Sequence, residues 1–366
     1  MLVAAGILIA ALLIPLIRMI NAAPAVVSHA GGVLNVSIGQ VDGRLIAVSA
    51  GRDATVRIWD LITKRQIGDF AAEELDGLPL SGRERAIFAV AFGELNGRPV
   101  IVSGGWDATI RIWDPLTAKQ IGDPLTGHER SVVSVAFGQV NGRPVVVSAS
   151  NDATIRVWDL TTRKQIGKPL GDRSGLIASV VVTELNGRPI IVSGGRDGTV
   201  RIWDLQTGKQ IGEPFTGHES NVVSVAVGQV NGRPVIVSGG WDATIRIWDP
   251  LTAKQIGDPL TGNERAGSPA AISVVNGRPV IVSGGVDNTI RLWDLADRKQ
   301  IGEPLAGHDR AVTALTVTQL NGRPVAVSGS DDQTLRMWDL TTRQQLGEPL
   351  RGHIATTTPT TTNQDN

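Results

Sequence analysis

The chain has 366 residues, and its 35 Lys and Arg residues balance 35 Asp and Glu residues, so its formal net charge is zero. A neutral chain has no net field that would draw it to nucleic acid or to an anionic membrane. The absence of Cys excludes disulfides, thiolate catalysis and Cys-ligated zinc.

The first 20 residues, MLVAAGILIAALLIPLIRMI, are apolar apart from Arg18. As one helix they would be about 30 Å long, which matches the hydrocarbon thickness of a bilayer. They predict a membrane anchor, and Arg18 on the C-terminal flank favours a cytoplasmic location for the rest of the chain.

Two alternatives to the anchor stay open. One is a cleaved signal followed by secretion: residues 23–25 (Ala-Pro-Ala) offer a small-residue site, although no basic residue precedes the apolar run. The other is that Met1 lies inside a longer protein and residues 1–20 end an upstream membrane span. Residues 21–27 are interpreted as a linker.

A repeated segment occupies the chain from about residue 28. The sequence NGRPVIVSGGWDATIRIWDPLTAKQIGDPLTG covers residues 96–127 and recurs letter for letter at residues 231–262. Looser copies each carry one Trp-Asp pair, with the Trp at Trp59, Trp113, Trp158, Trp203, Trp248, Trp293 and Trp338. The spacing is 45 residues from Trp113 onward and 54 before it. Such a period, with one Trp-Asp per copy, indicates a radially repeated β architecture that closes into one domain.

One copy predicts four antiparallel strands. Residues 131–137 are apolar and suit an inner strand, and Asn141-Gly142 then supplies a tight hairpin turn. Residues 144–150 form the second strand, and residues 154–159 form the third. The outer strand is KQIGKPL, residues 164–170, whose Gly and Pro suit an edge exposed to solvent.

The ends of the repeat array differ from its interior. Nine extra residues lie within FAAEELDGLP, residues 70–79, and are expected to form one helical turn between the first two copies. The last copy has its own outer strand, QQLGEPL (residues 344–350), so we expect closure without strand exchange. Residues 354–366 are polar and Thr-rich and predict a disordered tail.

In the pattern GH…S…D…WD the chain resembles the WD-repeat (WD40) family over residues 28–353. The resemblance implies an all-β fold, a single seven-bladed β-propeller of four-stranded antiparallel blades around a central channel. It also implies a buried, hydrogen-bonded tetrad of His, Ser, Asp and Trp in a blade. The matching sets are His29, Ser49, Asp53, Trp59; His128, Ser148, Asp152, Trp158; His218, Ser238, Asp242, Trp248; and His308, Ser328, Asp332, Trp338.

Blades 2, 4 and 6 depart from this pattern because Arg83, Arg173 and Asn263 stand at the His position. Arg offers only donors and cannot reproduce the role of a neutral imidazole. We expect complete tetrads in the odd blades and looser ones in the even blades. Blade 6 is expected to be the weakest, since Pro269 also interrupts its inner strand.

The Ser, His and Asp of each copy do not indicate a catalytic triad. The set recurs from blade to blade, whereas a catalytic site needs one exposed nucleophile. No HExxH pattern and no dense acidic loop is present. The sequence therefore predicts no catalytic residue, no metal site and no cofactor.

Seven Arg residues of the hairpin turns are expected to ring one face of the disc, and they are Arg44, Arg98, Arg143, Arg188, Arg233, Arg278 and Arg323. The Asp of each Trp-Asp offsets part of this charge, and no aromatic residues are interleaved for base stacking. Nucleic-acid binding is therefore disfavoured, and a solvated repeat feature is the preferred interpretation.

The opposite face carries residues that vary between blades. In the family, partners often dock through residues just before the tetrad Asp and two after the tetrad His. The candidates at these positions are Arg52, Arg85, Trp106, Arg130, Arg196, Trp241, Arg265 and Arg310. Trp106 and Trp241 are the strongest, because Trp and Arg are enriched in binding hot spots. Both belong to the identical 32-residue copies, so shared inheritance is the alternative.

The sequence thus predicts a non-enzymatic, monomeric scaffold that binds a protein or peptide on the face bearing Trp106, Trp241 and these Arg residues. The alternative is a membrane-tethered sensory or regulatory module of a larger signalling protein, for example one with an upstream kinase domain.

Overall fold

The computed structural model describes residues 31–71, 86–171, 175–262 and 269–351. The predicted anchor, the linker, the Thr-rich tail and nearly all of the insertion lie outside these ranges. Within these ranges, no helix has the length and apolarity needed to cross a bilayer.

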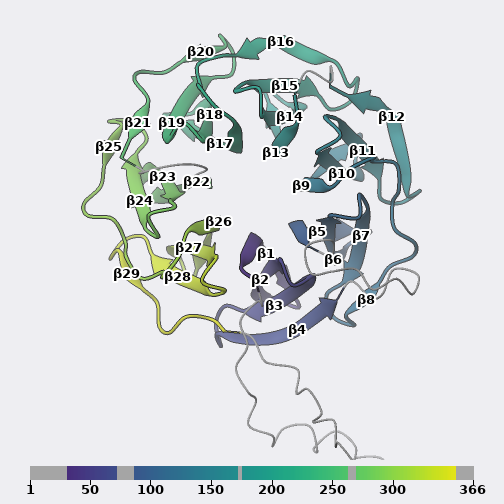
Figure 1. Ribbon diagram of the computed structural model, residues 1–366, viewed down its shortest axis with the longest axis horizontal. Coiled ribbons are helices and arrows are strands. Elements are labelled where there is room, and N and C mark those ends of the chain that lie inside the picture. Colours follow the sequence, from purple (N-terminus) through teal and green to yellow (C-terminus); the bar gives the residue numbers. More distant parts are fainter. Residues whose placement is uncertain (1–30, 72–85, 172–174, 263–268, 352–366) are drawn as a thin grey trace, which may run out of the picture.

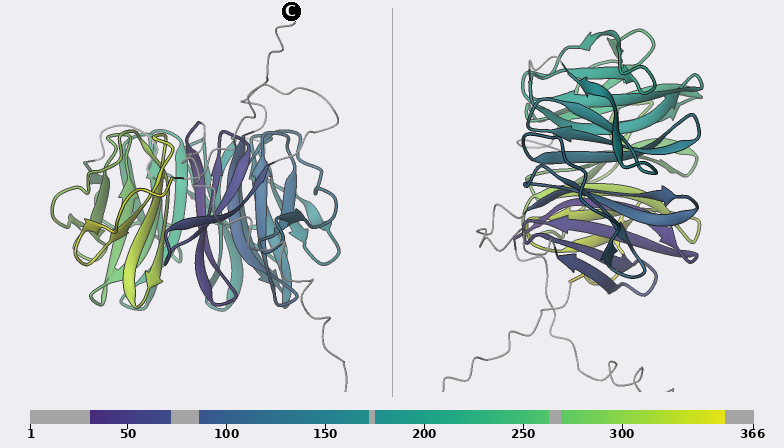
Figure 2. Two further views of the ribbon diagram at one scale, coloured as in Figure 1. Left: turned by 90° about the horizontal axis from the view of Figure 1, so that it is seen from below. Right: turned by 90° about the vertical axis from the view of Figure 1, so that its right-hand side faces the viewer.

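The described residues form seven antiparallel sheets arranged as blades in a ring (Figure 1). Each sheet uses consecutive strands of the chain, so the first and last blades exchange no strand among the described residues. Edge-on views show a disc whose strands run between its two flat faces (Figure 2). The predicted seven-bladed propeller is confirmed.

Each blade runs from the centre of the ring to its rim (Figure 1). The inner strands are β1 (Val33–Val41), β5 (Ile87–Leu95), β9 (Val132–Val140), β13 (Ile177–Leu185), β17 (Val222–Val230), β22 (Ala270–Val275) and β26 (Val312–Leu320). The second strands are β2 (Arg44–Gly51), β6 (Arg98–Gly105), β10 (Arg143–Ser150), β14 (Arg188–Gly195), β18 (Arg233–Gly240), β23 (Arg278–Gly284) and β27 (Arg323–Ser330).

The third strands each end in the Trp-Asp pair. They are β3 (Thr55–Asp60), β7 (Ile110–Asp114), β11 (Ile155–Asp159), β15 (Val200–Asp204), β19 (Thr244–Asp249), β24 (Ile290–Asp294) and β28 (Leu335–Asp339). The outer strands are β4 (Arg65–Ala71), β8 (Lys119–Gln120), β12 (Lys164–Leu170), β16 (Gln210–Phe215), β20 (Lys254–Gln255) with β21 (Leu260–Thr261), β25 (Lys299–Gln300) and β29 (Gln344–Gln345).

The hairpin between the first two strands has the predicted backbone. Asn141 has φ 51° and Gly142 has φ 74°, which matches a turn with two positive-φ residues. These turns lie on one face of the disc together with the loops after Trp-Asp, and we call it the turn face. The turns between second and third strands lie on the opposite face, which we call the tetrad face.

The outer strands are shorter than predicted in four blades. The sequence predicted QQLGEPL as the outer strand of blade 7, but only Gln344 and Gln345 form it, followed by an isolated bridge between Leu335 and Leu350. Gly347 adopts φ 78°, and Pro349 has no N–H to pair. The equivalent Gly167, with φ 68°, and Pro169 lie within the seven-residue strand β12, so these two residues do not by themselves shorten an outer strand.

The hydrophobic core is divided among the junctions between blades. One cluster joins blades 2 and 3, where Trp158 packs with Val102 and Ile112. An equivalent cluster closes the ring, since Trp59 of blade 1 packs with Leu335 and Met337 of blade 7. Each buried aromatic side chain stabilises by about 1.5–3 kcal/mol, so every junction, including the closing one, is held mainly by apolar burial.

Candidate functional site

A chain of hydrogen bonds joins the four predicted tetrad residues of blade 5. Asp242 lies 2.9 Å from Nδ1 of His218 through Oδ2, and Nε2 of His218 lies 2.7 Å from the Ser238 hydroxyl. The indole of Trp248 donates to the same hydroxyl at 2.8 Å. Because a carboxylate only accepts, Nδ1 carries the proton, and Nε2 accepts from Ser238.

Burial keeps this imidazole neutral. Desolvation lowers the pKa of His218 below its usual value, against the opposing effect of the Asp242 carboxylate. Burial opposes ionisation of Asp242 as well, but hydrogen bonds from the Glu219 amide and His218 hold the pKa of Asp242 below its usual range. The pair therefore stands as neutral His and ionised Asp near pH 7.

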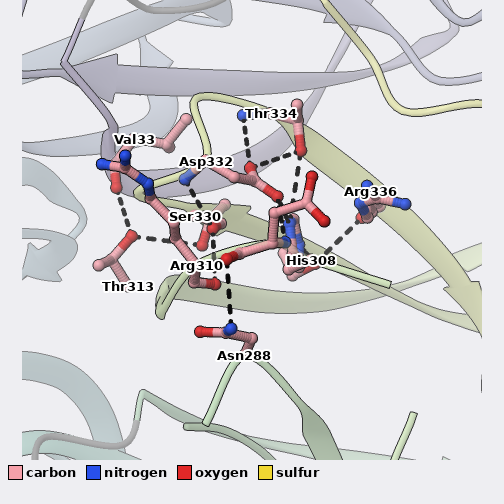
Figure 3. Close-up of polar contacts among 12 residues, drawn as sticks. Val33, Asn288, His308, Arg310, Thr313, Ser330, Asp332, Thr334 and Arg336 are labelled. Carbon is pink, nitrogen blue, oxygen red and sulfur yellow. Dashed lines mark hydrogen bonds and ion pairs between the residues drawn. The ribbon is translucent and has the colours of Figure 1, made fainter. Parts of the chain in front are cut away.

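Blades 3 and 7 repeat this arrangement. His128 lies 2.7 Å from both Asp152 and Ser148. In blade 7 His308 makes the same two contacts at 2.7 Å with Asp332 and Ser328, and Figure 3 shows Thr334 joining the carboxylate beside them. In these two blades the indole N–H groups of Trp158 and Trp338 donate to Ser148 and Ser328 at 2.8 Å.

Blade 1 and the even blades keep the indole–Ser bond but give the Asp another partner. In blades 2 and 6 the Asp is paired with the Arg four residues later at 2.5 Å, as Asp107–Arg111 and Asp287–Arg291. The equivalent ion pair in blade 4, Asp197–Arg201, is 2.9 Å long. Blade 1 has Asp53–Arg57 at 3.0 Å, and its predicted tetrad member His29 lies outside the described residues.

The same Arg turns away from the Asp wherever His is bonded to it. Arg156 donates instead to Gln165 at 2.7 Å, and Arg246 and Arg336 donate to Gln255 and Gln345 at the same distance. The Nε atoms of these three Arg residues are buried, and they have no hydrogen-bond partner in the part of the chain that the structure describes. Arg and His thus compete for one carboxylate, and the even blades are not left with an unpaired Asp.

Blade 4 has a small cavity beside the Asp197–Arg201 ion pair. A cavity of about 20 Å³ is lined by Ser193, Asp197, Thr199, Arg201 and Trp203, with neighbouring glycines. It has the size and the polar lining needed for one water molecule. Ser193 and Trp203, which line this cavity, are buried.

Two Trp side chains on the tetrad face do not belong to the core. Trp106 is 47% exposed and Trp241 is 49% exposed, each at the turn just before the tetrad Asp. The ring of Phe88, from inner strand β5, lies 6.0 Å from the ring of Trp106 at 45°. The equivalent residue in blade 5 is Val223, so an aromatic ring stands at this position beside Trp106 and an aliphatic side chain stands there in the blade of Trp241.

The Arg residues predicted for this face fall into three groups. Arg52 is engaged with Asp331 of blade 7 at 3.5 Å. Arg130, Arg196 and Arg310 are exposed, and their guanidinium groups make no ion pair with any residue that the structure describes. Arg85 and Arg265 lie outside the described residues.

The Arg residues of the turn face are partly neutralised. Arg188 is paired with Asp204, and Arg278 and Arg323 lie 3.8 Å and 4.0 Å from Asp294 and Asp339. The equivalent Asp159 of blade 3 accepts hydrogen bonds within its own turn: the Thr162 amide lowers the pKa of Asp159 more than burial raises it. This agrees with a solvated repeat feature.

Sequence reasoning missed the Thr and Arg partners of the tetrad Asp. Thr154 donates to Asp152 at 2.6 Å, and Arg111 takes the place of His in blade 2. The signal was present, because Thr and Arg stand four and two residues before every Trp of the Trp-Asp pairs. Phe88 was also missed, since nothing in its own copy marks it as a neighbour of Trp106.

No curated protein is similar to the chain at a significant level. The family profile described as "WD domain, G-beta repeat" matches residues 25–60, 79–114, 119–159, 180–204, 208–249, 267–294 and 298–339. These matches cover well over half of the sequence and coincide with the seven blades, so the chain belongs to the WD-repeat family of β-propellers.

Proposed function

We propose that this propeller is a non-enzymatic scaffold that binds a protein or peptide partner on its tetrad face. WD-repeat propellers are generally platforms for protein interaction and are typically not enzymes. The observation that carries the proposal is the pair of Trp side chains, 47% and 49% exposed, on turns of an otherwise regular ring. Exposed Trp near unpaired Arg is the composition of a binding hot spot.

The rest of the face supports the proposal. Arg130, Arg196 and Arg310 are exposed cations without a carboxylate partner among the described residues, and Arg can bind a carboxylate through two parallel hydrogen bonds. The turns connect strands of sheets that pack on their neighbours through apolar clusters. Little conformational entropy of the turns is therefore lost on binding. The membrane-tethered alternative stays a prediction, because it depends on residues outside the described ranges.

The test is affinity capture from the source cell with wild type and with the double variant Trp106→Ala, Trp241→Ala. Leu116→Ala with Leu251→Ala is a matched control, because these leucines are 60% and 59% exposed, belong to the same two identical copies and lie on the turn face. All forms must first show the same thermal unfolding.

Partners that are lost in the Trp variant and kept in the Leu variant would support the proposal. Partners kept in the Trp variant and lost in the Leu variant would contradict it and assign binding to the turn face.

A further inference from the structure

We infer that the junction of blades 2 and 3 is the main anchoring subsite of the tetrad face, and that it takes a peptide residue with a carboxylate next to an apolar side chain. This deepens the proposed function and rests on it. The subsite consists of Trp106 with Phe88 behind it, and of Arg130 and Asn151 of blade 3.

The closing junction of the ring shows which positions touch across two blades. A Cβ atom at Gly31 would lie 3.0 Å from Cβ of Arg52, and one at Gly32 would lie 2.6 Å from Oδ1 of Asp331. Arg52 and Asp331, both just before the tetrad Asp, are themselves in contact at 3.5 Å. Side chains at these positions in neighbouring blades therefore form one continuous surface.

We expect the same geometry at the junction of blades 2 and 3, because the corresponding residues stand at equivalent positions of the repeat. Arg130 and Ser131 are equivalent to Gly31 and Gly32, while Asn151 and Trp106 are equivalent to Arg52 and Asp331. Two backbone bonds hold the loops in place: the Asn151 amide donates to the Ser131 carbonyl at 3.0 Å, and the Trp106 amide donates to the Ala86 carbonyl at 3.0 Å. Arg130 thus adjoins Asn151, next to the Trp106 turn.

The chemistry of this junction points to a carboxylate and an apolar group. Arg130 is exposed and makes no ion pair with the described residues, the adjacent Glu129 included. The Trp106 ring is held against Phe88, which reduces the conformational freedom lost when an apolar side chain packs on it. Oδ1 of Asn151 is buried and accepts no hydrogen bond from the described residues, so rotation of this amide toward a bound peptide N–H would gain a bond.

Blade 5 provides an internal control. Trp241 lies in the identical 32-residue copy and is equally exposed. Val223 stands there in place of Phe88, and Val286 of blade 6 stands in place of Asn151. If exposure alone determined binding, both Trp residues would respond to the same ligand; the subsite predicts that Trp106 responds more strongly.

The experiment follows the indole N–H signals of the full chain by NMR, with the two exposed Trp residues assigned by Trp106→Phe and Trp241→Phe. The probes are three N-acetylated dipeptide amides that differ in charge: Glu-Leu, Gln-Leu and Lys-Leu. We expect Glu-Leu to shift the Trp106 signal saturably and to bind about fivefold more tightly than Gln-Leu. Arg130→Ala is expected to remove this preference, whereas Arg310→Ala, in blade 7, is expected to keep it.

Three outcomes would overturn the subsite: equal response to all three dipeptides, a preference that survives Arg130→Ala, or no response of Trp106. A response of Trp241 in the absence of one at Trp106 belongs to the last class. The proposed function is tested separately by partner capture. Loss of capture in the double Trp variant would support it even if no dipeptide shifts the Trp106 signal.

Discussion

Ser148 and Ser193 occupy the same position in blades 3 and 4, but their hydroxyl groups make different numbers of hydrogen bonds to other side chains. The Ser148 hydroxyl is bonded to His128 and to the Trp158 indole, at 2.7 Å and 2.8 Å. Ser193 is bonded to the Trp203 indole at 2.9 Å, and no His partner of Ser193 is among the described residues. The contribution of this Ser to stability therefore depends on whether its blade has the tetrad His.

This difference predicts unequal costs for the same substitution. Ser148→Ala leaves two buried nitrogen atoms unpaired and is expected to cost about 2–3 kcal/mol of unfolding free energy, against about 1 kcal/mol for Ser193→Ala. Urea denaturation followed by Trp fluorescence measures both. Equal losses would mean that the His128 contact contributes nothing to stability.

Among the inner strands that the structure describes, the one in blade 6 is the shortest. β22 has six residues, and it begins directly after Pro269, whereas β17 and β26 have nine. In blades 3, 4 and 5 the residue equivalent to Pro269 is Ser, whose hydroxyl accepts the amide N–H of the next inner strand at 3.0–3.3 Å. Pro269 offers no such acceptor to blade 7.

Hydrogen exchange is therefore expected to be about tenfold faster in β22 and β23 than in β17 and β18, because the paired segment is shorter and its opening costs less. Pro269→Ser supplies the residue found in blades 3 to 5 and is expected to slow this exchange. Mass spectrometry of peptic fragments resolves the blades. Uniform protection across blades 5, 6 and 7 would contradict the assignment of weakness to Pro269.

The strands differ in how well they can be predicted from the sequence alone. Asn-Gly turns and alternating strands depend on neighbours in the chain, so the blades were predictable from the 45-residue period. The shortening of outer strands was not, because Gly and Pro occupy the same positions in the seven-residue β12 and after the two-residue β29, so these residues do not distinguish the two cases. The pairing of Arg111 with Asp107 in place of a His, and the tilted contact between the rings of Phe88 and Trp106, depend on neighbours across strands.

At the scale of the molecule, the ring closes by repeating an internal junction. Val33 of blade 1 meets Gly329 of blade 7, where an added Cβ would lie 2.5 Å from the Val33 Cγ1 atom. The junction of blades 2 and 3 has the same geometry, with Val132 at 2.5 Å from a Cβ at Gly104. Polar links cross both junctions: Lys64 donates to the Leu346 carbonyl at 3.0 Å, Thr313 donates to the Val33 carbonyl and Arg52 pairs with Asp331 at the closing one. At the junction of blades 2 and 3, Arg163 donates to the Asp123 carbonyl.

If the closing junction is as strong as an internal one, Val33→Ala and Val132→Ala must cost the same. Both side chains are fully buried, and we expect each substitution to lower the unfolding free energy by about 1–3 kcal/mol through lost burial and the cavity left behind. Guanidinium denaturation gives the free energy, and its slope reports the surface exposed. A smaller loss for Val33→Ala together with a reduced slope would mean that the ring opens between blades 7 and 1 before the blades unfold. Equal losses and equal slopes would mean that seven similar junctions act as one cooperative ring, which is the rigidity that a fixed pair of Trp anchors requires.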